Sequence, residues 1–284
     1  MNLFDTKELL TKAYKGGYAV PAINADNTDT ITGVMKVCEK MKAPVIIQIA
    51  PIQVHPRQMN YRTVINAILD YARDYDVNLA VHLDHGDDLE DLKIATTSGF
   101  NSVMYDGSHH DFSVNMENTK KAREYADKIS LEGELGIIGG AEGSTESAEV
   151  SDDFCTDVNQ AKEYVKYTNV DFLAVAIGNA HGVYKNEPKL NFTRLAEINK
   201  QIDLPLVMHG ASGLSEKDIS RAVTMGISKI NFFTDVDKAF LNGIKSSLAE
   251  TPDAYTFKCF LDGRKAMEEK VAHIIRMCGC EGKA

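Results

Sequence analysis

Three histidines, His85, His181 and His209, each stand just past an apolar run that predicts a β-strand. In a chain that alternates strands and helices, the carboxyl ends of parallel strands meet on one face of the sheet or barrel. Three imidazoles that converge there are typical of a catalytic zinc site, which keeps a fourth position open. The pattern therefore predicts a metal centre, and Asp84, beside His85, adds a candidate proton carrier.

Residue alternation refines this interpretation. It sends His82 and Asp84 to one face of their strand and His85 to the other, but the backbone turns at the strand end, so Asp84 and His85 can both reach the rim. His82 is interpreted as a residue of the barrel interior or a hydrogen-bond partner of the site. His109 and His110 also fall near the rim, but adjacent residues are awkward joint ligands, so an ordinary structural role is favoured for both.

The periodicity of apolar residues predicts the helices and strands that must position these side chains. Amphipathic segments that predict helices include residues 89–97, 116–129 and 192–202, and Ser215 predicts the N-cap of another. Strands that alternate with helices indicate a parallel sheet, and eight such units predict a (β/α)8 TIM barrel, a single domain over residues 1–284. A doubly wound sheet would instead need a Gly-x-Gly-x-x-Gly turn after the first strand, which the chain lacks. The eight predicted strands are residues 19–24, 44–50, 79–84, 102–106, 129–135, 172–177, 205–209 and 227–233.

Composition limits the partners. The formal charge of −10 and the pI near 5.3 argue against nucleic-acid binding. No apolar stretch approaches the roughly 18 residues of a membrane span, and the first residues lack the pattern of a signal peptide. A cytoplasmic protein that binds neither nucleic acid nor membrane is expected. The five scattered cysteines are interpreted as reduced thiols.

Small-residue turns after the sixth and seventh predicted strands suggest an anion site. Residues 178–182 and 209–213 leave backbone N–H groups available to an anion, and residues 231–235 lead from the eighth strand into a helix N-terminus. Barrels often bind phosphate at these loops. The glycine-, serine- and acid-rich stretch 139–153 is interpreted as a mobile lid after the fifth strand.

Carboxylates also fall near the expected rim. Asp106 ends the fourth strand, Glu132 and Glu134 share one face of the fifth, and Glu142 lies in the candidate lid. Such groups ligate a metal, fix its ligands or move protons. The alternative interpretation, an ordinary surface charge, applies more strongly to Glu142 than to Asp84, because other acids share the loop of Glu142.

Five motifs together resemble the class II ketose-bisphosphate aldolases, the zinc-dependent fructose- and tagatose-bisphosphate aldolase family. They occur in order along nearly the whole chain: HLDHG at 82–86, MYDGS at 104–108, EGELG at 132–136, AIGNAHG at 176–182 and HGASG at 209–213. The resemblance implies that His85, His181 and His209 hold a catalytic Zn²⁺, and that Asp106 and Glu134 bind a second or displaced metal position. Co²⁺ or Mn²⁺ would also suit these ligands.

The same resemblance implies roles in the reaction. Asp84 would be the acid/base at the C4 hydroxyl, and Glu142 would exchange the proton at the dihydroxyacetone phosphate carbon. Asn231 would orient the enediolate, with Asn24 nearby. A monovalent cation, Na⁺ or K⁺, often sits near the phosphate in the family, and relatives are homodimers or homotetramers. The residues that would receive the phosphate are Gly182, Lys185, Gly210, Ser212 and Thr234.

The predicted activity is reversible, metal-dependent cleavage of a ketose 1,6-bisphosphate in carbohydrate metabolism such as glycolysis. Its products are dihydroxyacetone phosphate and an aldehyde, formed through a zinc-stabilised enediolate. The sequence leaves the sugar stereochemistry, fructose or tagatose type, open. Alternatives from other classes are a non-catalytic phosphosugar-binding barrel, a metal-dependent phosphosugar hydrolase or isomerase, and a Schiff-base aldolase that uses Lys229.

Departures from the family pattern point to an alternative substrate. Ala50, Phe233 and the pair Thr256-Phe257 stand where relatives often carry a hydroxyl, a smaller residue and a Pro-Arg pair. The missing hydroxyl and arginine are associated with the far phosphate of the bisphosphate. A ketose 1-phosphate or a deoxy-ketose phosphate with an unphosphorylated aldehyde half is therefore an alternative substrate. Cations that could replace the missing charge are Arg57, Arg62 and Lys258.

Overall fold

Eight parallel strands close into a barrel in the computed structural model, which describes residues 2–140, 147–148, 151–184 and 188–284. The closing hydrogen bonds join β4 to β5, and each predicted strand run overlaps one barrel strand, so the (β/α)8 barrel is confirmed. In barrel order the strands are β2 (Val20–Asn24), β3 (Val45–Ile49), β4 (Asn78–Gly86), β5 (Ser102–Tyr105), β6 (Ser130–Leu135), β8 (Phe172–Val175), β10 (Leu206–Met208) and β11 (Ile227–Phe232).

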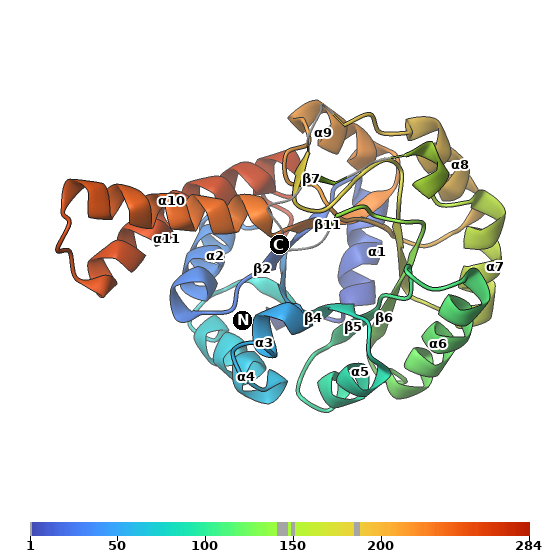
Figure 1. Cartoon of the computed structure of the whole chain (residues 1–284), viewed down its shortest axis with the longest axis horizontal. Coiled ribbons are helices and arrows are strands. Elements are labelled where there is room, and N and C mark those ends of the chain that lie inside the picture. The colour runs from blue at the N-terminus through green and yellow to red at the C-terminus, as the bar shows by residue number, and fades with distance from the viewer. Residues whose placement is uncertain (1, 141–146, 149–150, 185–187) are drawn as a thin grey trace.

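Helices surround this barrel (Figure 1). Two of them, α10 (Thr234–Glu250) and α11 (Thr256–Met277), pack along each other as a hairpin that projects beyond the barrel outline (Figure 1). The short strand β1 (Asn2–Leu3) pairs with β4, whereas β7 (Ser147–Ala148) and β9 (Val183–Tyr184) form a separate two-stranded sheet. The other helices are α1 (Thr6–Gly16), α2 (Thr28–Met41), α3 (Pro51–Val54), α4 (Tyr61–Ala72), α5 (Leu89–Thr96), α6 (Phe112–Tyr125), α7 (Val158–Thr168), α8 (Phe192–Gln201) and α9 (Glu216–Thr224), with a 3₁₀ turn at Asp152–Phe154.

Side-chain caps define several helix starts. Asp5, Asn27 and Ser215 accept backbone N–H groups at the first turns of α1, α2 and α9, which confirms the predicted Ser215 cap. The helix expected at residues 116–129 is displaced: α6 runs from Phe112 to Tyr125. Its C-terminal end is closed by Arg123, whose guanidinium donates to the carbonyl groups of Ala126 and Ile129.

The apolar core lies mainly between the strands and the surrounding helices, so the barrel strands are buried on both faces. Apolar side chains also dominate the usual barrel interior. Here, by contrast, buried polar and charged groups point inward, which requires hydrogen-bond or ion-pair partners for each of them. They are Asn24, Gln48, His82, Asp84, Glu132, Glu134, Lys229 and Asn231. Among the described helices, none has the length and apolar character to cross a membrane.

Candidate active site

The three predicted histidines meet at the carboxyl end of the barrel. The ring centroids lie 4.6 Å apart for His85 and His209, 4.8 Å for His85 and His181, and 5.9 Å for His181 and His209. One ring nitrogen from each lies within 4.8 Å of the others. Side chains from β4, the turn after β8 and the end of β10 therefore converge, as the sequence predicted.

A local backbone feature brings His85 into this group. His85 has a left-handed backbone with φ 46°, and the β4–β5 register shifts between Leu83 and Gly86. This turn interrupts the alternation of side chains along the strand, so the neighbours Asp84 and His85 both serve the same site. Histidine tolerates the left-handed region better than most residues with a Cβ.

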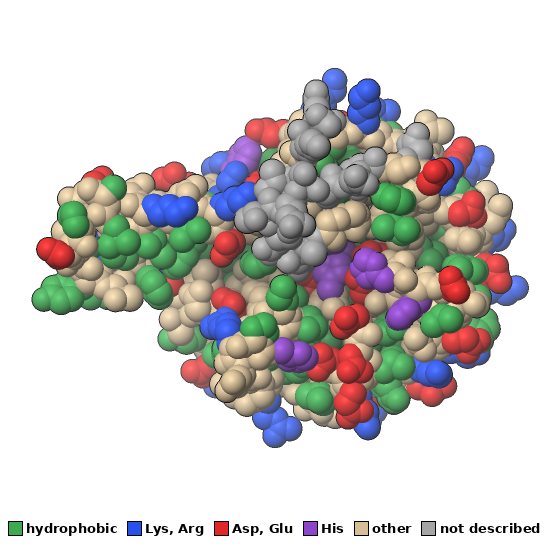
Figure 2. Space-filling model, in the orientation of Figure 1, with side chains coloured by type: hydrophobic (Ala, Val, Ile, Leu, Met, Phe, Trp, Pro, Cys, Tyr) green, Lys and Arg blue, Asp and Glu red, His purple; other side chains and the backbone are tan. Residues whose placement is uncertain are grey.

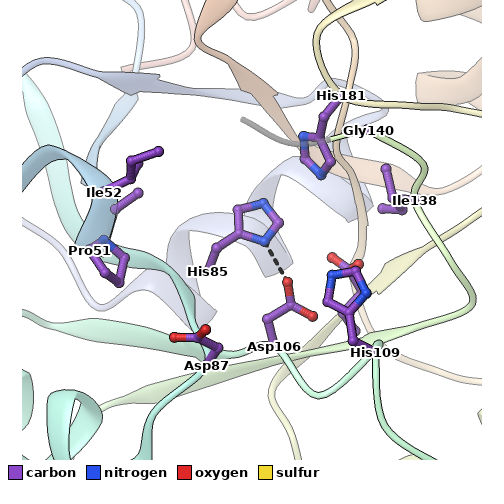
Figure 3. Close-up of a pocket in the computed structure, with 11 residues that line it drawn as sticks. Pro51, Ile52, His85, Asp87, Asp106, His109, Ile138, Gly140 and His181 are labelled. Atoms are coloured by element: carbon purple, nitrogen blue, oxygen red, sulfur yellow. Dashed lines mark hydrogen bonds and ion pairs between the residues drawn. The ribbon is translucent and has the colours of Figure 1, made fainter. Parts of the chain in front are cut away.

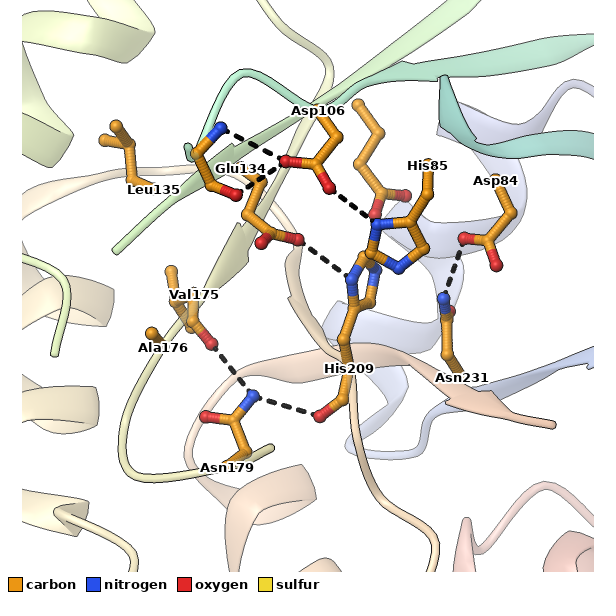
Figure 4. Close-up of polar contacts among 12 residues, drawn as sticks. Asp84, His85, Asp106, Glu134, Leu135, Val175, Ala176, Asn179, His209 and Asn231 are labelled. Atoms are coloured by element: carbon orange, nitrogen blue, oxygen red, sulfur yellow. Dashed lines mark hydrogen bonds and ion pairs between the residues drawn. The ribbon is translucent and has the colours of Figure 1, made fainter. Parts of the chain in front are cut away.

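Carboxylates hold one ring nitrogen of each of two histidines, and Figure 4 draws the bond between His85 and Asp106. His85 Nδ1 lies 2.8 Å from Asp106 Oδ2, and His209 Nε2 lies 2.9 Å from Glu132 Oε1. Burial opposes ionisation of Asp106, but hydrogen bonds from His85 and Ser108 hold its pKa well below the usual range. Such carboxylate–histidine pairs orient imidazoles for a metal.

Glu134 lies beside the three histidines. Its Oε2 is 3.0 Å from His209 Nδ1, and Glu134, Asp106 and His85 form a second group whose ligand atoms lie within 4.8 Å of one another. Burial and the negative charge of Asp106 raise the pKa of Glu134. The predicted pair for a second or displaced metal position, Asp106 and Glu134, is thus brought together next to the histidines.

Asp84 is fully buried and held by two amide groups. Gln48 Nε2 donates to its Oδ2 at 2.8 Å, and Asn231 Nδ2 donates to its Oδ1 at 2.9 Å. Burial opposes the charge of Asp84, but the nearby His85 and Lys229 outweigh it and lower the carboxyl pKa. Asn24 joins this network, because its Oδ1 accepts from the same Gln48 amide at 2.9 Å.

A cavity of about 300 Å³ opens in front of the histidines (Figure 3). Figure 2 shows this mouth as a hollow with histidine and acidic side chains gathered around it. An adjoining groove is lined by Asp87, Asp88 and Asp91, together with His55 and His110. Residues that line the cavity itself are Ala50, Pro51, Ile52, His85, Asp87, Asp106, His109, Glu134, Ile138, Gly140 and His181.

A second, narrower pocket lies on the other side of His181. It is lined by the turns after β8 and β10 and by the start of α10, and its lining comprises His181, Gly182, Gly210, Ser212, Asn231, Phe233 and Thr234. The predicted phosphate residues that the structure describes are therefore gathered in one place. Tyr184 joins the two turns, since its hydroxyl accepts from Ala180 N at 2.9 Å and donates to the Gly210 carbonyl at 2.7 Å.

Gly210 is required by the close approach of these turns. Its φ is 63°, and a Cβ there would lie 2.2 Å from the Ala180 carbonyl oxygen. We expect Gly210→Ala to lower the free energy of unfolding by about 3 kcal/mol, from left-handed strain plus the clash. Urea unfolding would measure it. Gly17→Ala is the matched control, because Gly17 has φ 65° and no atom within 4 Å of the added Cβ, so strain alone applies. Equal losses for the two variants would contradict the clash.

Two residues of the site carried no functional assignment in the sequence. Gln48 bridges Asp84 and Asn24, and its only signal is an amide in the middle of the apolar run of β3. Asn179 Nδ2 donates to the His209 carbonyl at 2.9 Å, and its Oδ1 accepts from Ile177 N at 2.7 Å. Asn179 thereby ties the turn after β8 to the turn that carries His209 (Figure 4).

Of three residues that depart from the family pattern, two line the pockets and one lies outside their described lining. Ala50 lines the larger cavity and Phe233 the narrower one. Phe257 lies 73 % exposed at the start of α11, stacked on Tyr255, and is absent from the described lining of both pockets. Among the candidate replacement cations, Arg57 pairs with Asp26 at 2.5 Å and Lys258 pairs with Asp262. Neither these two nor Arg62 belongs to the described lining of the larger cavity.

Glu142 and Lys185 lie outside the residues that the structure describes, and so does the middle of the candidate lid, residues 141–146. Their predicted roles stay predictions. At the base of that stretch, the Gly139 carbonyl accepts from His181 N at 2.8 Å. Lys229, the alternative nucleophile, is fully buried and lies 2.9 Å from Glu132 Oε2.

The donor set suits zinc. Three imidazole nitrogens converge from three strand ends, two of the rings are oriented by carboxylates, and burial with the positive charges of His85 and His209 keeps the pKa of His181 well below its ordinary value. Three convergent imidazoles that each offer one nitrogen match catalytic zinc sites, and a proton on such a nitrogen must leave before the ion binds. His85, His181 and His209 are therefore the residues that would hold the ion.

Comparison with known proteins identifies the family of the chain. The family profile described as fructose-bisphosphate aldolase class-II matches residues 4–283. The YdjI aldolase of Escherichia coli K12 is 31 % identical, superposes with a TM-score of 0.85, and the match covers 99 % of both chains. The fructose-bisphosphate aldolase of Campylobacter jejuni shares the fold, with 22 % identity, a TM-score of 0.85, and coverage of 100 % of this chain and 97 % of that one. The chain belongs to the class II fructose-bisphosphate aldolase family, and it is a TIM-barrel lyase of the aldolase type.

Proposed function

We propose that this aldolase cleaves a ketose 1-phosphate to dihydroxyacetone phosphate and an uncharged aldehyde. The observation that carries the proposal is the charge of the larger cavity. Its described lining contains the acids Asp87, Asp106 and Glu134 and apolar side chains such as Ile52 and Ile138, but neither lysine nor arginine. A second phosphate there would lose its hydration beside carboxylates and gain no cation.

The two pockets divide the substrate between them. The narrow pocket offers backbone N–H groups, Ser212 and the N-terminus of α10 to the phosphate on C1. Zn²⁺ held by His85, His181 and His209 would supply a Lewis acid that polarises the ketose carbonyl. The aldehyde half then extends into the cavity lined by Ala50, Pro51 and Ile52.

Asp84 is proposed to move the proton on the C4 hydroxyl. Its carboxylate accepts that proton as the C3–C4 bond breaks, the aldehyde leaves, and C3 afterwards receives a proton. Gln48 and Asn231 fix both oxygens, so the carboxylate is oriented before substrate arrives. The resemblance assigns the proton delivery at C3 to Glu142.

Cleavage of a ketose 1,6-bisphosphate is the second candidate. It is supported by the family's own description as fructose-bisphosphate aldolases. Under this candidate, a cation from outside the described lining must reach the far phosphate.

The two candidates differ in substrate preference. We expect EDTA-sensitive release of dihydroxyacetone phosphate from fructose 1-phosphate to have a higher kcat/KM than release from fructose 1,6-bisphosphate or tagatose 1,6-bisphosphate. A coupled assay for dihydroxyacetone phosphate measures all three. Preference for either bisphosphate would replace the first candidate with the second.

A charge introduced at the rim tests the same explanation. Ile52→Arg places a guanidinium at the cavity mouth, so it should raise the bisphosphate-to-monophosphate ratio of kcat/KM by about tenfold, equivalent to one charge-assisted hydrogen bond. Ile94→Arg is the matched control, because Ile94 is similarly exposed but lies on α5 outside the cavity lining. An equal change in both variants would mean that general surface charge is responsible.

A further inference from the structure

A cluster of buried charges lies inside the barrel beneath the histidine site. Lys229 on β11, Glu132 on β6 and His82 on β4 all have side chains with no exposed surface. Lys229 Nζ is 2.9 Å from Glu132 Oε2, and His82 Nε2 is 3.5 Å from the same oxygen. Neither Lys229 nor Glu132 is part of the described lining of the two site pockets, so direct contact with substrate does not explain the pair.

Glu132 divides its two oxygens between different partners. Oε2 faces Lys229 and His82, whereas Oε1 lies 2.9 Å from His209 Nε2. His82 is itself anchored, because its Nδ1 lies 2.7 Å from Ser102 Oγ. The carboxylate is therefore fixed on one side by a lysine from across the barrel and presents its other side to a predicted metal ligand.

His209 stands between two carboxylates. Its Nε2 faces Glu132, and its Nδ1 faces Glu134 at 3.0 Å, on the side where the other histidines converge. A neutral imidazole carries hydrogen on only one nitrogen, and the other supplies the lone pair for a metal. The ring can serve the site only if Nε2 keeps the hydrogen and Nδ1 faces the ligand cluster.

We propose that Lys229 is a positioning residue for the metal centre, acting through Glu132 on the orientation and tautomer of His209. The inference rests on the zinc site of the proposed function. Lys229 balances the charge of Glu132 and fixes its plane, so that Oε1 accepts the Nε2 hydrogen and Nδ1 is directed at the ion. A buried carboxylate deprived of its cation would reorient or recruit another partner, and His209 would lose its fixed acceptor.

The test compares Lys229→Met, Glu132→Gln and the double variant in the full-length protein. Zinc affinity is measured by competition with a chromogenic chelator, and the visible absorption spectrum of the Co²⁺-loaded protein reports ligand geometry. Each single variant should bind zinc 10- to 100-fold more weakly. Because both residues act through one path, the double variant should resemble a single variant, without multiplying the two losses. The Co²⁺ spectrum should change in all three.

Lys7→Met is the control for loss of a lysine–carboxylate pair far from the histidines. Lys7 also pairs with a carboxylate, Asp171, at 2.9 Å, but this pair involves α1 on the side of the barrel opposite the histidines. Zinc affinity and the Co²⁺ spectrum of this variant should equal those of the wild type. Thermal unfolding of each metal-free protein separates loss of fold from loss of metal geometry. If Lys229→Met does not fold, the double variant, which carries no unpaired buried charge from this pair, replaces it in the comparison with the wild type.

Three results would overturn the inference in distinguishable ways. Unchanged zinc affinity and Co²⁺ spectrum in folded variants would leave Lys229 a purely structural residue. Losses that multiply in the double variant would mean that Lys229 and Glu132 act separately. Failure of the wild type to bind zinc would remove the proposed zinc site itself, and the inference with it.

Discussion

Asp84→Asn is expected to lower kcat for carbon–carbon cleavage by about 10²–10⁴-fold, the usual contribution of a general acid/base. The amide cannot accept the C4 hydroxyl proton. Bound zinc should stay at one ion per chain, because Asp84 bonds to Gln48 and Asn231 and does not belong to either group of candidate ligands among the described residues. The measurements are steady-state cleavage and metal content by atomic absorption.

Asparagine at position 84 also forces a mismatch, since Gln48 and Asn231 both donate to the native carboxylate. One of these donors would face an NH₂ group, so the free energy of unfolding should fall by about 1–3 kcal/mol. Asp70→Asn, on the exposed face of α4, is the control and should change neither rate nor stability appreciably. Loss of zinc in parallel with activity would show that Asp84 is a ligand and not a proton carrier.

His85→Ala should remove both zinc and cleavage activity. Structural zinc sites with four ligands are worth about 10–16 kcal/mol, so removal of one ligand weakens zinc binding by roughly 10²–10³-fold. Asp106 would at the same time lose its hydrogen bond to the imidazole. Zinc affinity, metal content and dihydroxyacetone phosphate release should all fall together, while circular dichroism stays near that of the wild type.

His110→Ala provides the comparison for this experiment. His110 lines the adjoining acidic groove and belongs to neither group of candidate ligands among the described residues. We expect it to retain zinc. Cleavage by a zinc-free His85→Ala protein at the wild-type rate would contradict a metal mechanism and return attention to Lys229 as a nucleophile.

Much of the fold was predictable because burial on both faces leaves a strong sequence signal. Most barrel strands are short runs rich in apolar residues, although β6 carries two glutamates, and the predicted boundaries lie within two residues of those observed. Helix α6 was displaced because its end depends on Arg123 binding the following carbonyl groups, a contact that apolar periodicity does not encode.

The site was predictable where a residue type and its strand-end position sufficed, as for the three histidines and Asp106. Contacts between side chains on different strands were harder to predict from the sequence. Gln48 reads as an isolated polar residue in β3, and nothing local indicates that it holds Asp84. The sequence leaves Lys229 open as a nucleophile. Its partner Glu132 lies on a distant strand, and only the closed barrel brings the two together.

The left-handed backbone at His85 has a consequence for protein engineering. Consecutive residues on a regular strand address opposite faces, so a designer who copies only the side chains Asp84 and His85 onto another barrel would send one of them outward. The transplantable unit is the register shift and the φ of 46° together with the two side chains. In a directed-evolution library, β-branched residues at position 85 would therefore distort the loop path before they altered its chemistry.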